Sequence, residues 1–96
     1  MDLLTLEHFS GCVNETFRAE INGGEIEFVL VEARPIQAPA ANLMRAPFSL
    51  LFRNTSSFLF PQQTYPMHHS RVGDVGIFLV PIARERDGFL YQAIFN

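Results

Sequence analysis

The chain has 96 residues, of which 48% are hydrophobic, and these values predict one folded domain over residues 1–96 rather than a disordered segment. Its formal net charge is −3 and its seven basic residues are scattered, which argues against binding to nucleic acid. The single cysteine, Cys12, excludes an internal disulfide and favours a reducing compartment, so we expect a cytoplasmic protein.

The first predicted element is a short helix over Thr5–Phe9. Thr5 is a suitable N-cap, because its side-chain oxygen accepts a backbone N–H of the first turn, and Gly11 is a plausible end. Leu6 and Phe9 lie three residues apart and therefore share one face. A helix this short is unstable alone, so we expect it to pack against an apolar surface.

A β-hairpin follows. Apolar and polar residues alternate over Thr16–Ile21 and again over Glu25–Ala33, which is the pattern of strands with one buried face. Between them, Asn22-Gly23-Gly24 tolerates the positive φ angles of a tight turn.

The middle of the chain is less regular. The proline-containing segment Arg34–Pro47 predicts a surface loop, and Phe48–Arg53 predicts the next strand. Phe58–Pro61 is expected to form a short apolar edge, and Gln63–His68 a further strand that Pro66 interrupts.

The chain closes on two segments that are apolar on both faces, Val75–Ile82 and Phe89–Asn96, joined by a turn at Arg86-Asp87-Gly88. The longest apolar run, Ile77–Ala83, is far shorter than the roughly 20 residues of a membrane helix, and no signal peptide is apparent at the N-terminus. The pattern as a whole predicts a mainly β fold: a small antiparallel β-barrel or sandwich of about six strands with a short N-terminal helix.

One face of the closing hairpin fills the core, and its second face needs another cover. The small predicted helix offers too little apolar surface for that purpose. We therefore expect an interface with a protein partner or with copies of the same chain, formed by Phe78, Val80, Ile82, Tyr91 and Phe95.

The sequence contains no recognisable catalytic or metal-binding motif. His68 and His69 are adjacent in a predicted strand, so their side chains point to opposite faces and do not share one metal. His8 and Cys12 supply only two ligands, and the serines lack the context of a nucleophile. We expect no metal, no cofactor and no catalytic residue, and thus a non-enzymatic structural or assembly protein.

An alternative function stays open at this point. Arg53, Tyr65, His68 and His69 cluster in the central third of the sequence and are the only plausible polar lining of a pocket. If they converge, the chain is a small-molecule-binding barrel or a minor enzyme.

Several segments also resemble a family of small bacterial proteins of about this length that carry a domain of unknown function. The matching segments span nearly the whole chain: Leu4–Phe9, Phe48–Arg53, Pro61–Tyr65, Val72–Gly73, Ile77–Ile82 and Tyr91–Asn96. The resemblance implies no substrate or catalytic residue; such proteins occur beside genes for phage-tail-collar-like proteins, which implies an accessory role in a tail-like particle. Gln63 stands where the family motif has glycine, so we expect a different turn there if that glycine takes positive φ.

Overall fold

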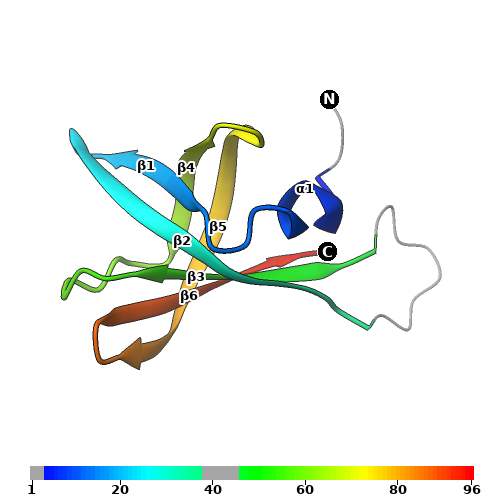
Figure 1. Cartoon of the computed structure of the whole chain (residues 1–96). Helices are drawn as coiled ribbons and strands as arrows, with labels where there is room; N and C mark the ends of the chain where they lie inside the picture. The colour runs from blue at the N-terminus through cyan, green and yellow to red at the C-terminus, as the bar shows by residue number, and fades with distance from the viewer. Residues whose placement is uncertain (1–3, 38–45) are drawn as a thin grey trace.

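Alternating apolar residues close the chain into an antiparallel β-barrel. A computed structural model describes residues 4–37 and 46–96 (Figure 1). The strand order around the barrel is β1-β2-β3-β6-β5-β4. The elements in chain order are α1 (Leu6–Ser10), β1 (Thr16–Ile21), β2 (Gly24–Pro35), β3 (Phe48–Asn54), β4 (Gln63–His69), β5 (Gly73–Glu85) and β6 (Gly88–Phe95). The mainly β fold predicted from the sequence is confirmed, and it takes the form of a barrel.

The first hairpin forms as its turn residues predict. Asn22 and Gly23 have φ angles of 53° and 80°, the left-handed conformation that a two-residue hairpin turn requires. The turn sets the register in which Phe17 pairs with Phe28 and Ala19 with Ile26. This register places Phe17 and Phe28 inside the barrel, where both are fully buried.

Aromatic rings fill the interior. The ring of Phe28 lies 5.4 Å from the rings of both Tyr65 and Tyr91 and 6.4 Å from that of Phe52, measured between centroids. Each of these residues comes from a different strand, and none of the four is exposed to solvent. Large rings are the main source of buried apolar area in a core this small.

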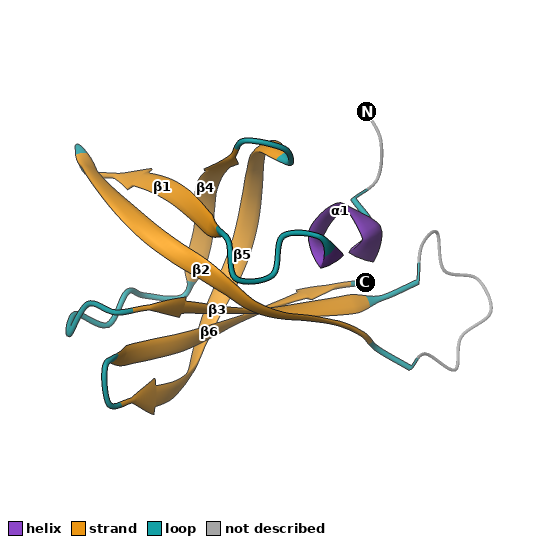
Figure 2. Cartoon of the chain, viewed as in Figure 1, coloured by secondary structure: helices purple, strands orange, loops and turns teal. Residues whose placement is uncertain are grey.

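Helix α1 covers one end of the barrel, near the C-terminus (Figure 2). Phe9 of α1 is fully buried, with its ring centroid 5.8–6.2 Å from those of Phe17, Phe48 and Phe95. The backbone N–H of Thr5 donates to Nδ1 of His8 at 2.9 Å and fixes the first turn. The predicted helix is therefore confirmed, one residue later than expected, and its apolar support is the rim of the barrel.

The closing hairpin presents two different faces. Ile77, Leu79 and Tyr91 point inward and are fully buried. Phe78 and Ile94 point outward, and each is 50% exposed. A β-bulge between Pro81 and Ala83 inserts one extra residue into β5, and bulges of this kind bend a strand to follow barrel curvature.

In the middle of the chain, the structure differs from the sequence prediction at Phe58–Phe60 and at Pro66. Phe58–Phe60 forms no strand. The Phe58 N–H donates to the Ser56 hydroxyl and the Phe60 N–H donates to the Tyr91 hydroxyl, so neither amide pairs with a neighbouring strand. Strand β4 continues through Pro66, which pairs with Gly76 of β5. Gln63 begins β4 and is not among the described residues with positive φ.

The predicted loop over Arg34–Pro47 begins too early, because β2 extends to Pro35 where it pairs with Phe48. The base of the connection is closed by the Ile36 N–H, which donates to the Pro47 carbonyl at 2.9 Å. The rest of that prediction, residues 38–45, lies outside the described residues.

Candidate functional site

The four residues proposed to line a pocket do not meet. Tyr65 is fully buried inside the barrel, whereas Arg53 and His68 lie on its outer surface. His69 points inward near α1, where its ring stacks on Phe17 at 4.5 Å. Successive strand residues alternate between faces, so the side chains of the adjacent histidines point in different directions, although both residues line one shallow groove beside Arg71. A common pocket of all four residues, as predicted, is wrong.

Tyr65 and Arg53 both have structural partners. The Tyr65 hydroxyl donates to the Pro61 carbonyl and holds the β3–β4 connection, and burial raises the pKa of this phenol. Arg53 binds Glu85 through Nε at 2.7 Å and Nη2 at 3.3 Å, and these hydrogen bonds lower the pKa of Glu85. Both side chains are therefore committed to contacts between elements of the barrel.

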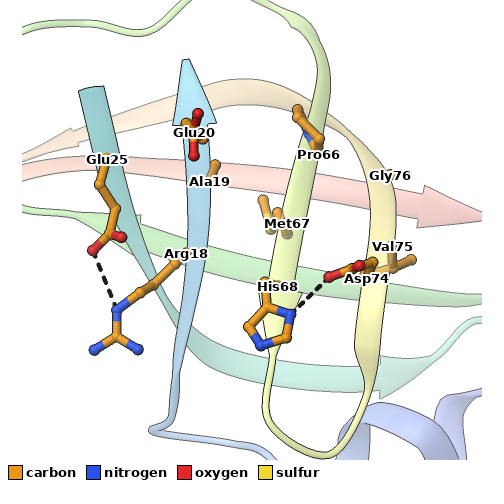
Figure 3. Close-up of a pocket in the computed structure, with 10 residues that line it drawn as sticks. All are labelled: Arg18, Ala19, Glu20, Glu25, Pro66, Met67, His68, Asp74, Val75 and Gly76. Carbon is orange, nitrogen blue, oxygen red and sulfur yellow. Dashed lines mark hydrogen bonds and ion pairs between the residues drawn. The ribbon is translucent and has the colours of Figure 1, made fainter. Parts of the chain in front are cut away.

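His68 lies in a surface groove of about 490 Å³ between the β1–β2 hairpin and the β4–β5 hairpin (Figure 3). Its Nδ1 is 2.7 Å from an Asp74 carboxylate oxygen. On the opposite side, Arg18 Nε lies 3.3 Å from Glu25 and 3.6 Å from Glu27. The register aligns Glu27, Arg18, His68 and Asp74 in one row across four strands, with a carboxylate at each end of the row.

A second polar cluster joins the start of β1 to the β4–β5 turn. His69 is only 4% exposed, and its Nε2 lies 2.8 Å from Glu15 Oε1. Arg71 Nη2 donates to the same carboxylate oxygen and to the Gly11 carbonyl at 3.1 Å. Hydrogen bonds from Arg71 and then from His69 lower the pKa of Glu15, so the carboxylate is ionised and holds both partners.

The ligand atoms of Cys12, Glu15 and His69 all lie within 4.8 Å of one another, which raises the question of a metal site. The backbone N–H groups of Arg71 and Val72 donate to His69 Nδ1 at 3.0 and 3.2 Å, so that nitrogen carries no proton. Nε2 therefore carries it and donates to Glu15. A metal at Nε2 would require an imidazolate, whereas a metal-binding histidine normally donates from its other nitrogen.

The Arg71 guanidinium also lies 3.7 Å from Cys12 Sγ, in the position that a bound cation would need. The arrangement therefore favours a structural role over a metal centre: its hydrogen bonds connect the start of β1 to the β4–β5 turn. Sequence reasoning missed Glu15 and Arg71, because Glu15 and His69 are 54 residues apart and no motif connects them.

The predicted interface residues divide between the two faces of the hairpin. Phe78 and Ile82 are 50% and 49% exposed, and Val80 is half-buried. Tyr91 is fully buried and its hydroxyl accepts the Phe60 N–H, so its assignment to an interface is wrong. Phe95 stacks on Phe48 at 4.6 Å and packs against the core, so it too belongs to the barrel rather than to its outer face.

Both corrections have one cause, the alternation of β6. Odd-numbered residues of this strand point into the barrel, and its outward positions are Leu90, Gln92 and Ile94. Ile94, 50% exposed, and Leu90, half-buried, are the outer apolar residues that the predicted interface omits.

Comparison with known proteins gives a family. The model of a domain of unknown function, DUF6916, matches residues 4–95. The chain belongs to the DUF6916 family. No curated protein and no solved structure matches this DUF6916 chain. Among its described residues, no helix is both long and apolar enough to cross a membrane.

Proposed function

We propose that this DUF6916 protein is a non-enzymatic interaction protein that docks through the outer face of β5 and β6. We define this outer apolar face by Phe78, Val80, Ile82, Leu90 and Ile94. The observation that carries the proposal is the exposure of three large members, Phe78, Ile82 and Ile94, at 49–50% each. Apolar side chains gathered on one surface of a folded domain often mark a site of protein association.

The residues of this face lie on strands joined in one ladder. Val80 pairs with Gln92, while Phe78 lies two residues before Val80 and Ile94 two residues after Gln92 on the same outer side. Further along, Leu90 pairs with Ala83 beside the bulge. The outward side chain of Gln92 lies between Leu90 and Ile94, so the face is apolar except at this position. Burying its apolar part would contribute about 25 cal/mol per Å² removed from water.

The occupant that we propose is a second copy of the same chain. None of the five residues carries a charge, so two such faces brought together by a two-fold axis bury apolar groups against apolar groups without trapping an ion. A partner recognised by charge would not find a matching group on this face.

The test is the oligomeric state of the purified protein. We expect light scattering after size exclusion to give a dimer, and Phe78→Ser or Ile94→Ser to convert it to a monomer with an unchanged circular dichroism spectrum. Phe58→Ser is the matched control, because Phe58 is 61% exposed but lies in the β3–β4 connection, outside the outer apolar face. A monomeric wild-type protein, or an equal effect of all three variants, would overturn the proposal.

Two finer proposals depend on other observations. The free, buried Cys12 supports a cytoplasmic location. The resemblance noted in the sequence supports an accessory role in a phage-tail-like particle, which co-sedimentation of the protein with such particles would test. The separation of Arg53, Tyr65, His68 and His69 supports the non-enzymatic proposal over the small-molecule pocket.

A further inference from the structure

The outer apolar face surrounds one polar side chain, that of Gln92. Gln92 lies on the outward side of β6 between Leu90 and Ile94. Across the ladder it pairs with Val80, which is the middle member of the face on β5. The amide group therefore lies at the centre of the face and not at its rim.

The Gln92 amide has no hydrogen-bond partner within the described part of the chain. Gln92 is half-buried, and among residues 4–37 and 46–96 no group forms a hydrogen bond with its side chain. The five apolar side chains of the face offer it no donor or acceptor. Water can hydrate the amide in a single chain, and any surface that covers the face takes this water away.

A covering surface must therefore supply a hydrogen-bond partner at its own centre. A buried amide without a partner disfavours association, because its polar atoms lose their hydrogen bonds to water. A surface that is apolar throughout would leave Gln92 unpaired. A second glutamine amide suits it, because each amide has an acceptor oxygen and an NH₂ donor, so two amides can satisfy each other.

We propose that Gln92 selects a second copy of the chain as the partner, by pairing with the same residue of that copy beside the two-fold axis. This inference rests on the proposed function, because it concerns the same face. A two-fold dimer uses one patch on both chains, so the axis passes through the patch and its central residue lies nearest to its own copy. A single buried asparagine has the same role in coiled coils, where it fixes the register and the number of chains.

The first experiment places opposite charges at this position. Gln92→Glu and Gln92→Lys each bring two like charges together across the axis, so each variant alone should dimerise about a hundredfold more weakly. An equimolar mixture should form a heterodimer, since each pair then contains one glutamate and one lysine. Light scattering after size exclusion gives the mass, and circular dichroism checks the fold. If either variant does not fold alone, co-expression and co-purification of two differently tagged chains replace the mixing.

The matched control makes the same two substitutions at Ser57, which is exposed in the β3–β4 connection and outside the outer apolar face. Ser57→Glu and Ser57→Lys should each remain dimeric. Loss of the dimer in these control variants would trace the effect to charge in general and would count against the pairing.

Gln92→Leu tests the pairing without adding a charge. In a two-fold dimer this one substitution replaces both members of the pair, and such a replacement is nearly neutral or stabilising because no polar group is left unpaired. We therefore expect Gln92→Leu to associate at least as tightly as the wild type. If Gln92 bonded a different group of the second copy, that group would lose its partner and the dimer would weaken.

The outcomes separate this inference from the proposed function. A mixture of the charge variants that stays monomeric, or a weakened Gln92→Leu dimer, would overturn the inference alone, because the face would then be used without pairing of the two amides. Charge variants that remain dimeric while Phe78→Ser is monomeric would do the same. A monomeric wild-type protein, or a dimer that neither Phe78→Ser nor the charge variants dissociate, would overturn both.

Discussion

Replacing Gly88 by alanine should be among the most damaging single changes in this barrel. Gly88 begins β6 with φ of 139°, a conformation that is almost restricted to glycine. A Cβ built there would lie 2.0 Å from the Asn54 carbonyl oxygen and 2.7 Å from the Thr55 Cα. These neighbours are backbone atoms, so no side-chain rotation relieves the clash and β3 must move away from β6.

The cost has two parts. A residue held in such a backbone conformation loses about 1–3 kcal/mol. Forcing an extra methyl group into a packed site costs about 1–3 kcal/mol more. The sum is about 4 kcal/mol. This is a large fraction of the free energy of unfolding of a typical domain, which is about 5–15 kcal/mol.

Two other glycines separate these contributions. Gly23 has φ of 80° and no atom within 4 Å of a built Cβ, so Gly23→Ala should cost only the backbone part, about 1–2 kcal/mol. Gly11 has φ of −83° and also has open space, so Gly11→Ala should be neutral or stabilise by up to about 1 kcal/mol.

The measurement is the free energy of unfolding from urea titrations followed by circular dichroism. The protein concentration is held constant, because the dimerisation that we propose would add to the apparent stability. We expect Gly11→Ala to be the most stable of the three variants, Gly23→Ala to be intermediate and Gly88→Ala to be the least stable. If Gly88→Ala were as stable as Gly23→Ala, the close approach of β6 to the end of β3 would be wrong.

Two further predictions concern the cluster near α1 and the end of the chain. Because the folded-state pKa of Glu15 is lowered, its ionisation stabilises the fold above its unfolded pKa of about 4.5 and stops doing so as pH falls through the lower folded value. Glu15→Gln should therefore have a lower free energy of unfolding than wild type at pH 7 and the same value at pH 2. A difference that stays constant between these pH values would contradict the stabilising role of the ionised Glu15 carboxylate. Deleting Tyr91–Asn96 should abolish folding, because it removes most of β6 and opens the barrel between β3 and β5; a cooperatively folded product in thermal unfolding would refute this role.

Local patterns were sufficient to predict much of the fold. Asn22-Gly23 specifies its turn through φ angles that few other residues adopt, and alternation specifies which side chains of β1 and β2 face inward. The sequence did not predict how the barrel closes, because the pairing of β1 with β4 joins residues about fifty positions apart. The same is true of the pair between Glu15 and His69, whose formation depends on that closure.

The outward direction of side chains was predicted correctly for β5 and incorrectly for β6. In β5, Phe78 and Ile82 were assigned to the outer face, and both are exposed. In β6, the prediction places the aromatic residues Tyr91 and Phe95 on the outer face, whereas both follow the inward alternation and Ile94 points outward. Residue size was therefore a poor guide, because the largest rings are the ones that a small barrel needs inside.

The aromatic rings that fill the barrel also leave little space for a ligand in its interior. Eight strands give a barrel interior just wide enough for side chains to fill, so a six-stranded barrel has less room still. Here the rings of Phe28, Tyr65 and Tyr91 occupy it. The contact surface that we propose is therefore on the outside of the barrel, where β5 and β6 present uncharged apolar groups.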